Sequence, residues 1–540
     1  MTTPIQLYDT TLRDGMQGEG MSLSAEEKLR VAHRLDALGV QLIEAGFPTS
    51  NPKELELFEL LSRETFATAE IAAFGMTRRR ELRADEDPAL RVLADCFAPV
   101  VTLVGKTWAL HLEKVVKVDR DENLRMIEES IAFLVAQGKR VVYDAEHCLD
   151  GWRDDRDYAL RCLRAAAEAG AETVVPCDTN GASLPDQIAE TIADVVAHLA
   201  DTGARVGTHN HNDLECGVAN SLAAVRAGAT HVQGTMNGYG ERCGNANLCS
   251  IVPNLQLKLG YDCLPADRLA TLTETAHYLD ELLNRTPNPN QPYVGKNAFA
   301  HGGGMHVAGV LADPSTFEHM DPALVGNHRD LLISELSGKG TVLARAEEAG
   351  LRLDDAAARR VIEEVKRKEH DGYHFEAADG SFELLLRKES GEYEELFTLE
   401  SWSVVVQKAG HDARVTTDAA IRLWANGKRY VCHAEGNGPV HALDKALRVA
   451  LEQSHPELKN TGLVNFKVRI LDVTKGTDAV TRVLLDASDG HDVWGSTGVS
   501  PNIIEASWDA LVDSLEYAIQ PGRDRVGTRG ASTPAGTAAA

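Results

Sequence analysis

The sequence predicts an α/β chain that begins with a closed barrel of eight parallel strands. Three observations point to this fold. Eight short apolar runs recur in the first part of the chain, segments with helical spacing of apolar residues separate them, and strand–helix alternation requires parallel strands joined by crossovers. Eight such units within about 260 residues match the usual length of a (β/α)8 TIM barrel.

The predicted strands occupy residues 5–8, 40–45, 70–74, 100–104, 140–144, 173–177, 205–208 and 231–234. Between them, segments such as 25–38 and 186–199 carry apolar residues at i, i+3 and i+4, which is typical of helices that cover a sheet. A doubly wound open sheet is the alternative fold. It usually has a Gly-rich turn after its first strand, and residues 9–14 (DTTLRD) contain no glycine.

Composition changes along the chain predict four segments. The barrel domain spans 1–265, linker subdomains 266–395, an α+β domain 396–521, and a disordered tail 522–540. The linker has helical patterns at 266–283 and 342–368, separated by a Pro-, Asn- and Gly-rich stretch. In the α+β domain we expect strands at 400–408, 418–425, 430–434, 466–473 and 481–487, with helices at 439–453 and 503–518. The tail is rich in Gly, Ala and Thr.

The bulk composition excludes several classes of protein. A net charge of −26 over 540 residues argues against non-specific binding to nucleic acid or to anionic membranes. The N-terminus lacks the pattern of a signal peptide, and no apolar run is long enough to span a bilayer. The nine cysteines are scattered and form no C-x-x-C pair, which favours reduced thiols. We therefore expect a soluble cytoplasmic protein.

Polar side chains gather where the predicted strands end, which is the face that carries the site in barrels of this type. They are Arg13, Asp14, Glu44, Asp144, Glu146, His147, Asp178, Thr179, His209, His211, Asn237, Glu241 and Asn245. His209 and His211 are two apart at a strand end, so both imidazoles point to one side. Because strand 1 lies near strand 7 in a closed barrel, Asp14 could complete a two-histidine, one-carboxylate metal site. A polar histidine-rich loop is the alternative interpretation.

Three further residues have a predicted role and an ordinary alternative. Arg13 keeps its charge and could stabilise an oxygen that becomes negative, or it could form a structural ion pair with Glu44 or Asp178. Glu146 could carry a proton or support the metal site, or it could be a solvated loop acid. Thr179 could donate its hydroxyl to a substrate carboxylate, or it could cap the strand end.

Long segments of the chain resemble one family. "DTTLRDGMQGEGMSLSAEEK" and "THNHNDLECGVANS" are similar to the two signatures of the acetyl-CoA-dependent 2-keto acid condensing enzymes, which are the isopropylmalate, citramalate and homocitrate synthases. The resemblance continues through "YDAEHCLDG", "PCDTNG", "QGTMNGYGERCGNANLCSIVPNLQLKLGY", "AFAHGGGMH" and "LVGNHRDLLISELSGKG" to "AEGNGPVHALDKAL" and "GVSPNIIEASWDALVDSLEYAI" near the C-terminus. The sequences of these segments are most similar to those of the citramalate synthase branch.

The resemblance implies an acyltransferase that condenses acetyl-CoA with pyruvate and hydrolyses the thioester. It implies a divalent metal, Zn2+, Mn2+ or Mg2+, held by Asp14, His209 and His211 with Asn245 close by. It places Arg13 on the keto oxygen, Thr179 on the keto acid carboxylate and Glu146 near the acetyl group. His306, with His301 as a weaker candidate, would act in proton transfer from the linker of a partner subunit. The C-terminal domain would form a homodimer and bind isoleucine as a feedback inhibitor, although "EGNGP" could equally be a turn in a purely structural dimerisation domain.

Two residues depart from the family pattern. Met16 stands where isopropylmalate synthases usually carry a glutamate, and Glu215 stands where a glycine is expected after the HND motif. Three other functions remain open at this point. They are condensation with another 2-keto acid, as in a 2-isopropylmalate synthase, cleavage of a hydroxyacyl-CoA by a lyase, and metabolite binding by a non-enzymatic regulator.

Overall fold

The computed structural model describes residues 4–48, 50–265, 267–408, 410 and 414–521. The chain divides into two compact units. The barrel unit contains residues 1–299 and 322–328, and the C-terminal unit contains residues 300–321 and 329–540. The tail predicted to be disordered, 522–540, lies outside the described residues.

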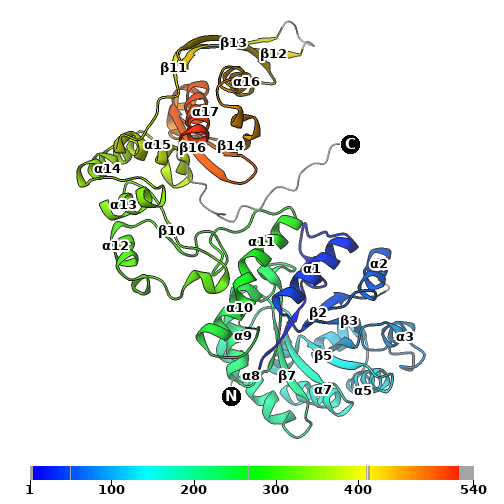
Figure 1. Cartoon of the computed structure of the whole chain (residues 1–540). Coiled ribbons are helices and arrows are strands. Elements are labelled where there is room, and N and C mark those ends of the chain that lie inside the picture. The colour runs from blue at the N-terminus through cyan, green and yellow to red at the C-terminus, as the bar shows by residue number, and fades with distance from the viewer. Residues whose placement is uncertain (1–3, 49, 266, 409, 411–413, 522–540) are drawn as a thin grey trace. The chain divides into compact units, whose positions relative to one another are not determined.

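The barrel unit contains a closed barrel of eight parallel strands in the order β1 to β8, as predicted (Figure 1). The strands are Gln6–Asp9, Leu42–Gly46, Glu70–Met76, Val100–Lys106, Arg140–Glu146, Thr173–Asp178, Arg205–Asn210 and His231–Gly234. Pairing of β1 with β8, from Gln6 opposite His231 to Asp9 opposite Gly234, closes the ring. A buried cluster with members from β1 to β6, including Tyr8, Leu42 and Val142, fills the interior.

Helices connect successive strands. They are α1 (Ala25–Leu38), α2 (Pro52–Leu61), α3 (Pro88–Asp95), α4 (Ala109–His111), α5 (Arg120–Ala136), α6 (Cys148–Asp154), α7 (Arg156–Glu168), α8 (Pro185–Leu199) and α9 (Gly217–Arg226), followed by α10 (Leu248–Pro253) and α11 (Leu272–Leu282). Local signals set their limits. Helix α1 begins with a capping box between Ser24 and Glu27 and ends at Gly39, whose φ of 99° is left-handed.

The C-terminal unit combines helices with two three-stranded antiparallel sheets. Its strands are β9 (Ala300–His301), β10 (Asp330–Leu331), β11 (Phe397–Lys408), β12 (Val415–Ala425), β13 (Lys428–Gly436), β14 (Gly462–Ile470), β15 (Thr481–Ser488) and β16 (Val493–Ser500). Its helices are α12 (Gly304–Ala312), α13 (Lys339–Glu348), α14 (Asp355–His370), α15 (Asp379–Ser390), α16 (Pro439–Leu451) and α17 (Ile503–Ile519).

Two expectations for the C-terminal unit were wrong or incomplete. The single helix expected over 342–368 is broken into α13 and α14, because Gly350 is left-handed at φ 71° and Asp354 caps a new helix by accepting from Ala357 N. Strand β16, which contains two glycines, and helix α15 were not predicted. The domain limits at 265 and 395 stay predictions. The barrel unit itself continues to residue 299 and resumes at 322–328.

All nine cysteines are free thiols. Within the described part of the chain, no helix is both long enough and apolar enough to cross a membrane.

Helix α17 gives the C-terminal unit a pH-dependent stability. Burial and the nearby charges of Asp513 and Glu505 raise the pKa of Asp509 to about 6. The folded state therefore holds a proton more tightly than the unfolded chain. The associated stability is fully present below the unfolded pKa of 3.8 and is lost as pH rises from there to about 6. Because Asp509 is partly exposed, solvent screens part of this effect. We therefore expect the ionised Asp509 to lower the free energy of unfolding by only roughly 1 kcal/mol at neutral pH.

Asp509→Asn is accordingly expected to stabilise the full chain at pH 8, where it removes a disfavoured charge, and to have a much smaller effect at pH 4, where the carboxyl is largely protonated in the folded state and about half protonated in the unfolded chain. Thermal unfolding at the two pH values measures this. Asp418→Asn, at an exposed position of β12, is the matched control and should change stability at neither pH. An Asp509→Asn effect of equal size at both pH values would contradict the electrostatic explanation.

Candidate metal centre and active-site mouth

The loop after β1 is fixed by buried hydrogen bonds before it reaches the predicted site. Asp9 accepts from the backbone amide of Thr11 at 2.8 Å and from its hydroxyl at 2.9 Å. The Thr11 hydroxyl in turn accepts from the amide of Met236, which follows β8, at 2.9 Å. The "DTT" sequence thus ties the ends of β1 and β8 together. Asp14 then stands at the N-cap of the short 3-10 helix Gly15–Gln17.

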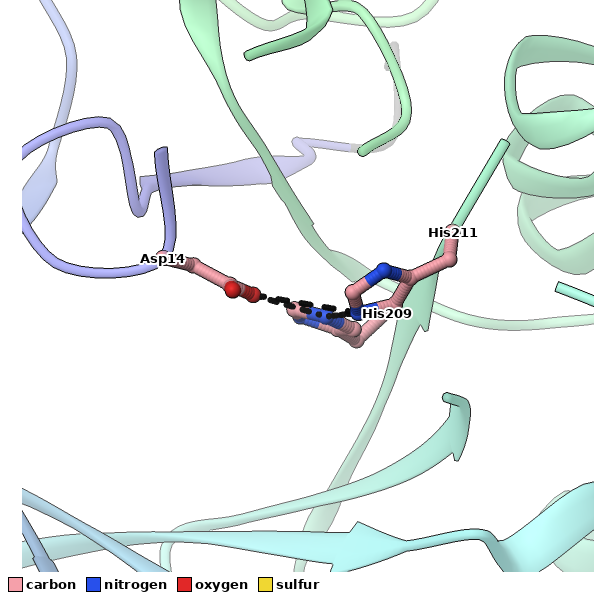
Figure 2. A group of neighbouring side chains, drawn as sticks. All are labelled: Asp14, His209 and His211. Atoms are coloured by element: carbon pink, nitrogen blue, oxygen red, sulfur yellow. Dashed lines mark hydrogen bonds and ion pairs between the residues drawn. The ribbon is translucent and has the colours of Figure 1, made fainter. Parts of the chain in front are cut away.

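Asp14, His209 and His211 meet at one buried place (Figure 2). His209 Nε2 lies 3.3 Å from Asp14 Oδ2, and His211 Nε2 lies 3.9 Å from the same oxygen. The two Nε2 atoms are 3.3 Å apart. Each side chain is at most 7% exposed. His209 lies on β7 and His211 directly after it, so the i, i+2 prediction that both rings face one side is reproduced by the geometry.

The protonation of this group suits a cation. Burial alone would raise the pKa of Asp14, but the charge of Arg13 and the contact with His209 outweigh it and hold that pKa well below its usual range. Burial and the neighbouring His209 lower the pKa of His211 to about 4, so His211 is neutral at pH 7. For His209, burial opposes the charged form, yet contact with Asp14 leaves its pKa raised. The carboxylate is therefore ionised and at least one imidazole offers a lone pair.

Neighbouring amides orient the candidate ligands. His209 Nδ1 lies 2.8 Å from Gln233 Oε1, an acceptor that places the ring proton on Nδ1 and turns Nε2 toward the cluster. Gln233 Nε2 donates to Asp144 at 2.8 Å, which fixes the amide. Asn245 forms an isolated antiparallel bridge with His211. Its side-chain oxygen is buried and has no hydrogen-bond partner among the described residues.

These observations fit a divalent cation. Three donor atoms lie within 4.8 Å of one another, and the facing Nε2 lone pairs repel unless a proton or a cation lies between them. The unpartnered oxygen of Asn245 adds an acceptor beside them. Two imidazoles and one carboxylate leave coordination positions open for a substrate. The mixed N and O donors suit Zn2+ as well as Mn2+ or Mg2+, so the set alone does not select one metal.

Arg13 is anchored from the second strand. Its Nε donates to Glu44 Oε2 at 2.6 Å, and its guanidinium lies 4.1 Å over the ring of Phe74. Glu44 is fully buried and also accepts from the Tyr8 hydroxyl at 2.9 Å. The ion pair considered as the alternative role is thus present. It occupies Nε, and Nη1 forms a longer ion pair with Asp14, 3.6 Å from its Oδ2. Nη2 makes no hydrogen bond to any described residue and is available to a substrate oxygen.

Thr179 follows β6 with its hydroxyl poised as a donor. The Thr179 oxygen accepts from the His147 amide at 2.9 Å, which leaves its proton for a second partner. Arg242 donates to the Thr179 carbonyl at 2.8 Å and pairs with Asp213 at 2.8 and 3.0 Å. This pair links the loops after β6, β7 and β8. Arg242 was not predicted, although it stands between Glu241 and the metal-site motif in the sequence.

Glu146 is the last residue of β5 and forms an ion pair with Lys106, the last residue of β4. Beside them, His111 stacks on Trp108 and lies 4.2 Å from the ring of His147. Burial, then the charges of His147 and Lys106, lower the pKa of His111 to about 4. Sequence reasoning missed Lys106, Trp108 and His111. A lysine and two aromatic rings directly after an apolar run were the available signal.

Other polar residues at the strand ends have structural roles. Asp178 accepts from the amide and hydroxyl of Ser183 and shapes the β6 loop. Asn237 donates to the carbonyl of Ala276 on α11. Glu241 is exposed.

The two linker histidines belong to the C-terminal unit, so their part in the site stays a prediction. His306 is exposed on α12, with its ring stacked 4.4 Å from Phe317. His301 lies 3.1 Å from Glu318, which also binds Arg329 through two contacts of 2.6 Å. His301 is therefore engaged in a local ion-pair cluster.

The two departures from the family pattern have local explanations. Glu215 has a left-handed φ of 58°, the conformation in which glycine is favoured, and its side chain is exposed. The change from glycine thus concerns backbone strain and adds no acid to the buried cluster. Met16 is half-buried within the short helix after Asp14.

Three protein families match successive parts of the chain. Residues 4–277 match the HMGL-like family, residues 293–372 the homocitrate synthase post-HMGL domain-like family, and residues 376–519 the LeuA allosteric (dimerisation) domain. The chain is 44% identical to an (R)-citramalate synthase of Geobacter sulfurreducens over 97% of this chain and 99% of the relative. It is 47% identical to (R)-citramalate synthases of Synechocystis, with 96% of each chain covered, and of Streptomyces coelicolor, with 95% of this chain and 96% of the relative covered.

Proposed function

Because the chain belongs to the HMGL-like family, within the group of (R)-citramalate synthases, we propose that it condenses acetyl-CoA with pyruvate and hydrolyses the thioester to give citramalate and CoA. The observation that carries this proposal is the meeting of Asp14, His209 and His211 beside the guanidinium group of Arg13, whose Nη1 lies 3.6 Å from Asp14 Oδ2. A lyase barrel would not need the long regulatory segment that follows. The cleavage reaction is therefore the weaker candidate.

The chain's own residues account for binding and charge stabilisation. Asp14, His209 and His211, with Asn245 nearby, would hold a divalent cation, which supplies Lewis acidity and a template for a 2-keto acid. Arg13, held by Glu44, would bind the keto oxygen as it gains negative charge. The Thr179 hydroxyl would donate a hydrogen bond to the carboxylate of pyruvate. Arg242 would keep the Thr179 backbone in place.

Carbon–carbon bond formation requires loss of a proton from the acetyl methyl group. We assign that proton to Glu146, whose carboxylate lies at the mouth on β5. The new bond joins the methyl carbon to the keto carbon, and the keto oxygen takes up a proton. Water then cleaves the thioester and releases CoA, a step in which His306 of a partner subunit would act. Hydrolysis makes the overall reaction irreversible.

The remaining assignments follow from the same relationship. Since residues 376–519 match a LeuA allosteric (dimerisation) domain, we propose a homodimer that binds isoleucine as a feedback inhibitor. We also propose a cytoplasmic location. Acetyl-CoA and pyruvate are available there, and cysteines stay reduced.

An assay of CoA release tests the function. Purified protein with a divalent metal and acetyl-CoA should release CoA with pyruvate at least about tenfold faster than with 2-oxoisovalerate, because a pocket sized for a methyl group excludes added carbons at roughly 1–3 kcal/mol each. The product should be citramalate. Preference for 2-oxoisovalerate would indicate an isopropylmalate synthase, and no release with any keto acid would favour a metabolite-binding regulator. Repeating the assay with isoleucine tests the regulation separately, because an unchanged rate removes that assignment and leaves the barrel chemistry standing.

A further inference from the structure

The ion pair between Lys106 and Glu146 is built into the barrel. Strands β4 and β5 run parallel and in register, so that Lys106 and Glu146 are direct partners at their carboxyl ends. The side chains are mostly buried, at 13% and 26% exposed. Among the described residues, Glu146 is the only acidic partner of Lys106. Register alone therefore places one ammonium group beside one carboxylate at the mouth.

Two further hydrogen bonds fix the backbone from which these side chains start. Asn123 Nδ2 donates to the Lys106 carbonyl at 2.8 Å, and Thr107 Oγ1 donates to the Glu146 carbonyl at 2.8 Å. Asn123 and Thr107 are each only 1% exposed. Flexible surface pairs lose most of their Coulomb energy to solvent screening and side-chain entropy. Here hydrogen bonds hold the backbone at both strand ends, so formation of the Lys106–Glu146 pair costs little conformational entropy.

The other charges around Glu146 are already paired or neutral. Asp150 on α6 lies 3.3 Å from His147 Nδ1 and accepts from Arg153 at 2.7 Å. His111 on α4 is neutral at pH 7, because burial and then His147 and Lys106 lower its pKa to about 4. The other acids at these strand ends are Asp144, two residues before Glu146 on β5, which accepts from Gln233, and Asp178, the last residue of β6, which accepts from Ser183. Within the described residues, Lys106 is thus the cation left to act on Glu146.

We propose that Lys106 is a positioning residue for the condensation, holding Glu146 ionised and aimed at the acetyl group. This inference rests on the proposed role of Glu146 as the group that takes the methyl proton. An adjacent positive charge typically lowers a carboxyl pKa by about 1–3 units. A base protonated at neutral pH cannot accept the proton, so the ammonium keeps the enzyme in its active form as pH falls.

The test compares pH profiles of the metal-loaded full-length enzyme. In Lys106→Met, the midpoint of the acidic limb of kcat/KM should move up by about 1 unit or more. Its rate should therefore fall more at pH 6 than at pH 8, while KM for pyruvate stays unchanged. Lys106→Arg restores a positive charge and should keep the wild-type profile. The matched control is Lys114→Met, which removes an exposed lysine paired with Glu113 and should change nothing.

Further variants separate the possible failures. Glu146→Gln should remove most activity, and near-normal kcat there would overturn the base assignment itself. If Glu146→Gln is inactive but Lys106→Met leaves the acidic limb in place, only the inference about Lys106 falls. Should Lys106→Met destabilise the fold, Lys106→Gln supplies the same comparison without a charge. The double variant Lys106→Met/Glu146→Gln should be no less active than Glu146→Gln alone, and an additive loss would contradict a role through Glu146.

Discussion

Asp14→Asn is expected to remove the bound metal and to lower kcat by more than about a hundredfold. Mutation of a residue that only hydrogen-bonds to a metal ligand typically lowers metal affinity or activity by about 10–100-fold, and loss of a ligand should lower it further. Asparagine keeps the shape of the side chain but offers no negative charge to balance a dication. The loss should therefore concern the metal and leave the barrel folded. Metal content by elemental analysis and CoA release with pyruvate measure the two effects on one sample.

Asp213→Asn is the control for metal content, since Asp213 lies two residues after His211 and pairs with Arg242. It should retain the metal. A metal-loaded Asp14→Asn enzyme with full activity would show that Asp14 is not a ligand. A fully active protein prepared without metal would remove the metal site altogether.

Arg13→Ala is expected to lower kcat by at least about a hundredfold, equivalent to roughly 3 kcal/mol of transition-state stabilisation. It should also lower the free energy of unfolding by about 3–5 kcal/mol, because it leaves the buried Glu44 without its partner. These two losses have different causes. One concerns the developing oxyanion, and the other concerns a charge that water cannot reach.

The double variant Arg13→Ala/Glu44→Gln separates them. Removing the buried charge should return much of the lost stability, while kcat should stay low. Urea unfolding and CoA release provide the two measurements. If the double variant regains near-normal kcat, Arg13 serves the fold alone, and the stabilisation of the keto oxygen must come from another group.

Barrel strands were predictable because their interiors are continuously apolar, while the strand ends were not. Strand β4 was expected to end at residue 104 and continues to Lys106, and β5 was expected to end at 144 and continues to Glu146. Polar residues at the open end of the barrel interrupt the apolar run, so the sequence pattern predicts a loop at these positions instead of a strand. This is the reason that the partner of Glu146 was missed.

The candidate metal ligands could be predicted because their geometry follows from strand periodicity. Residues two apart on a strand face one side, and closure of the barrel brings β1 near β7. The orienting contacts of Gln233 and Arg242 could not be predicted in this way. Gln233 faces His209 through the register of β8 against β7 and the rotamers of both side chains. Arg242 reaches Thr179 through the path of the loop after β8. Neither register nor loop path leaves a periodic trace in the sequence. The role of His306 depends on a subunit arrangement that one chain does not contain.

Closure of the barrel through β1 and β8 also has a consequence for biogenesis. Asp14 leaves the first strand and His209 lies on the seventh, so the chelating set does not exist until nearly the whole ring has assembled. A partly folded chain has no preformed cation site, because bringing these distant segments together first costs the conformational entropy of loop closure. With the proposed ligands, we therefore expect a cation to bind only after the ring has closed and then to stabilise the closed ring.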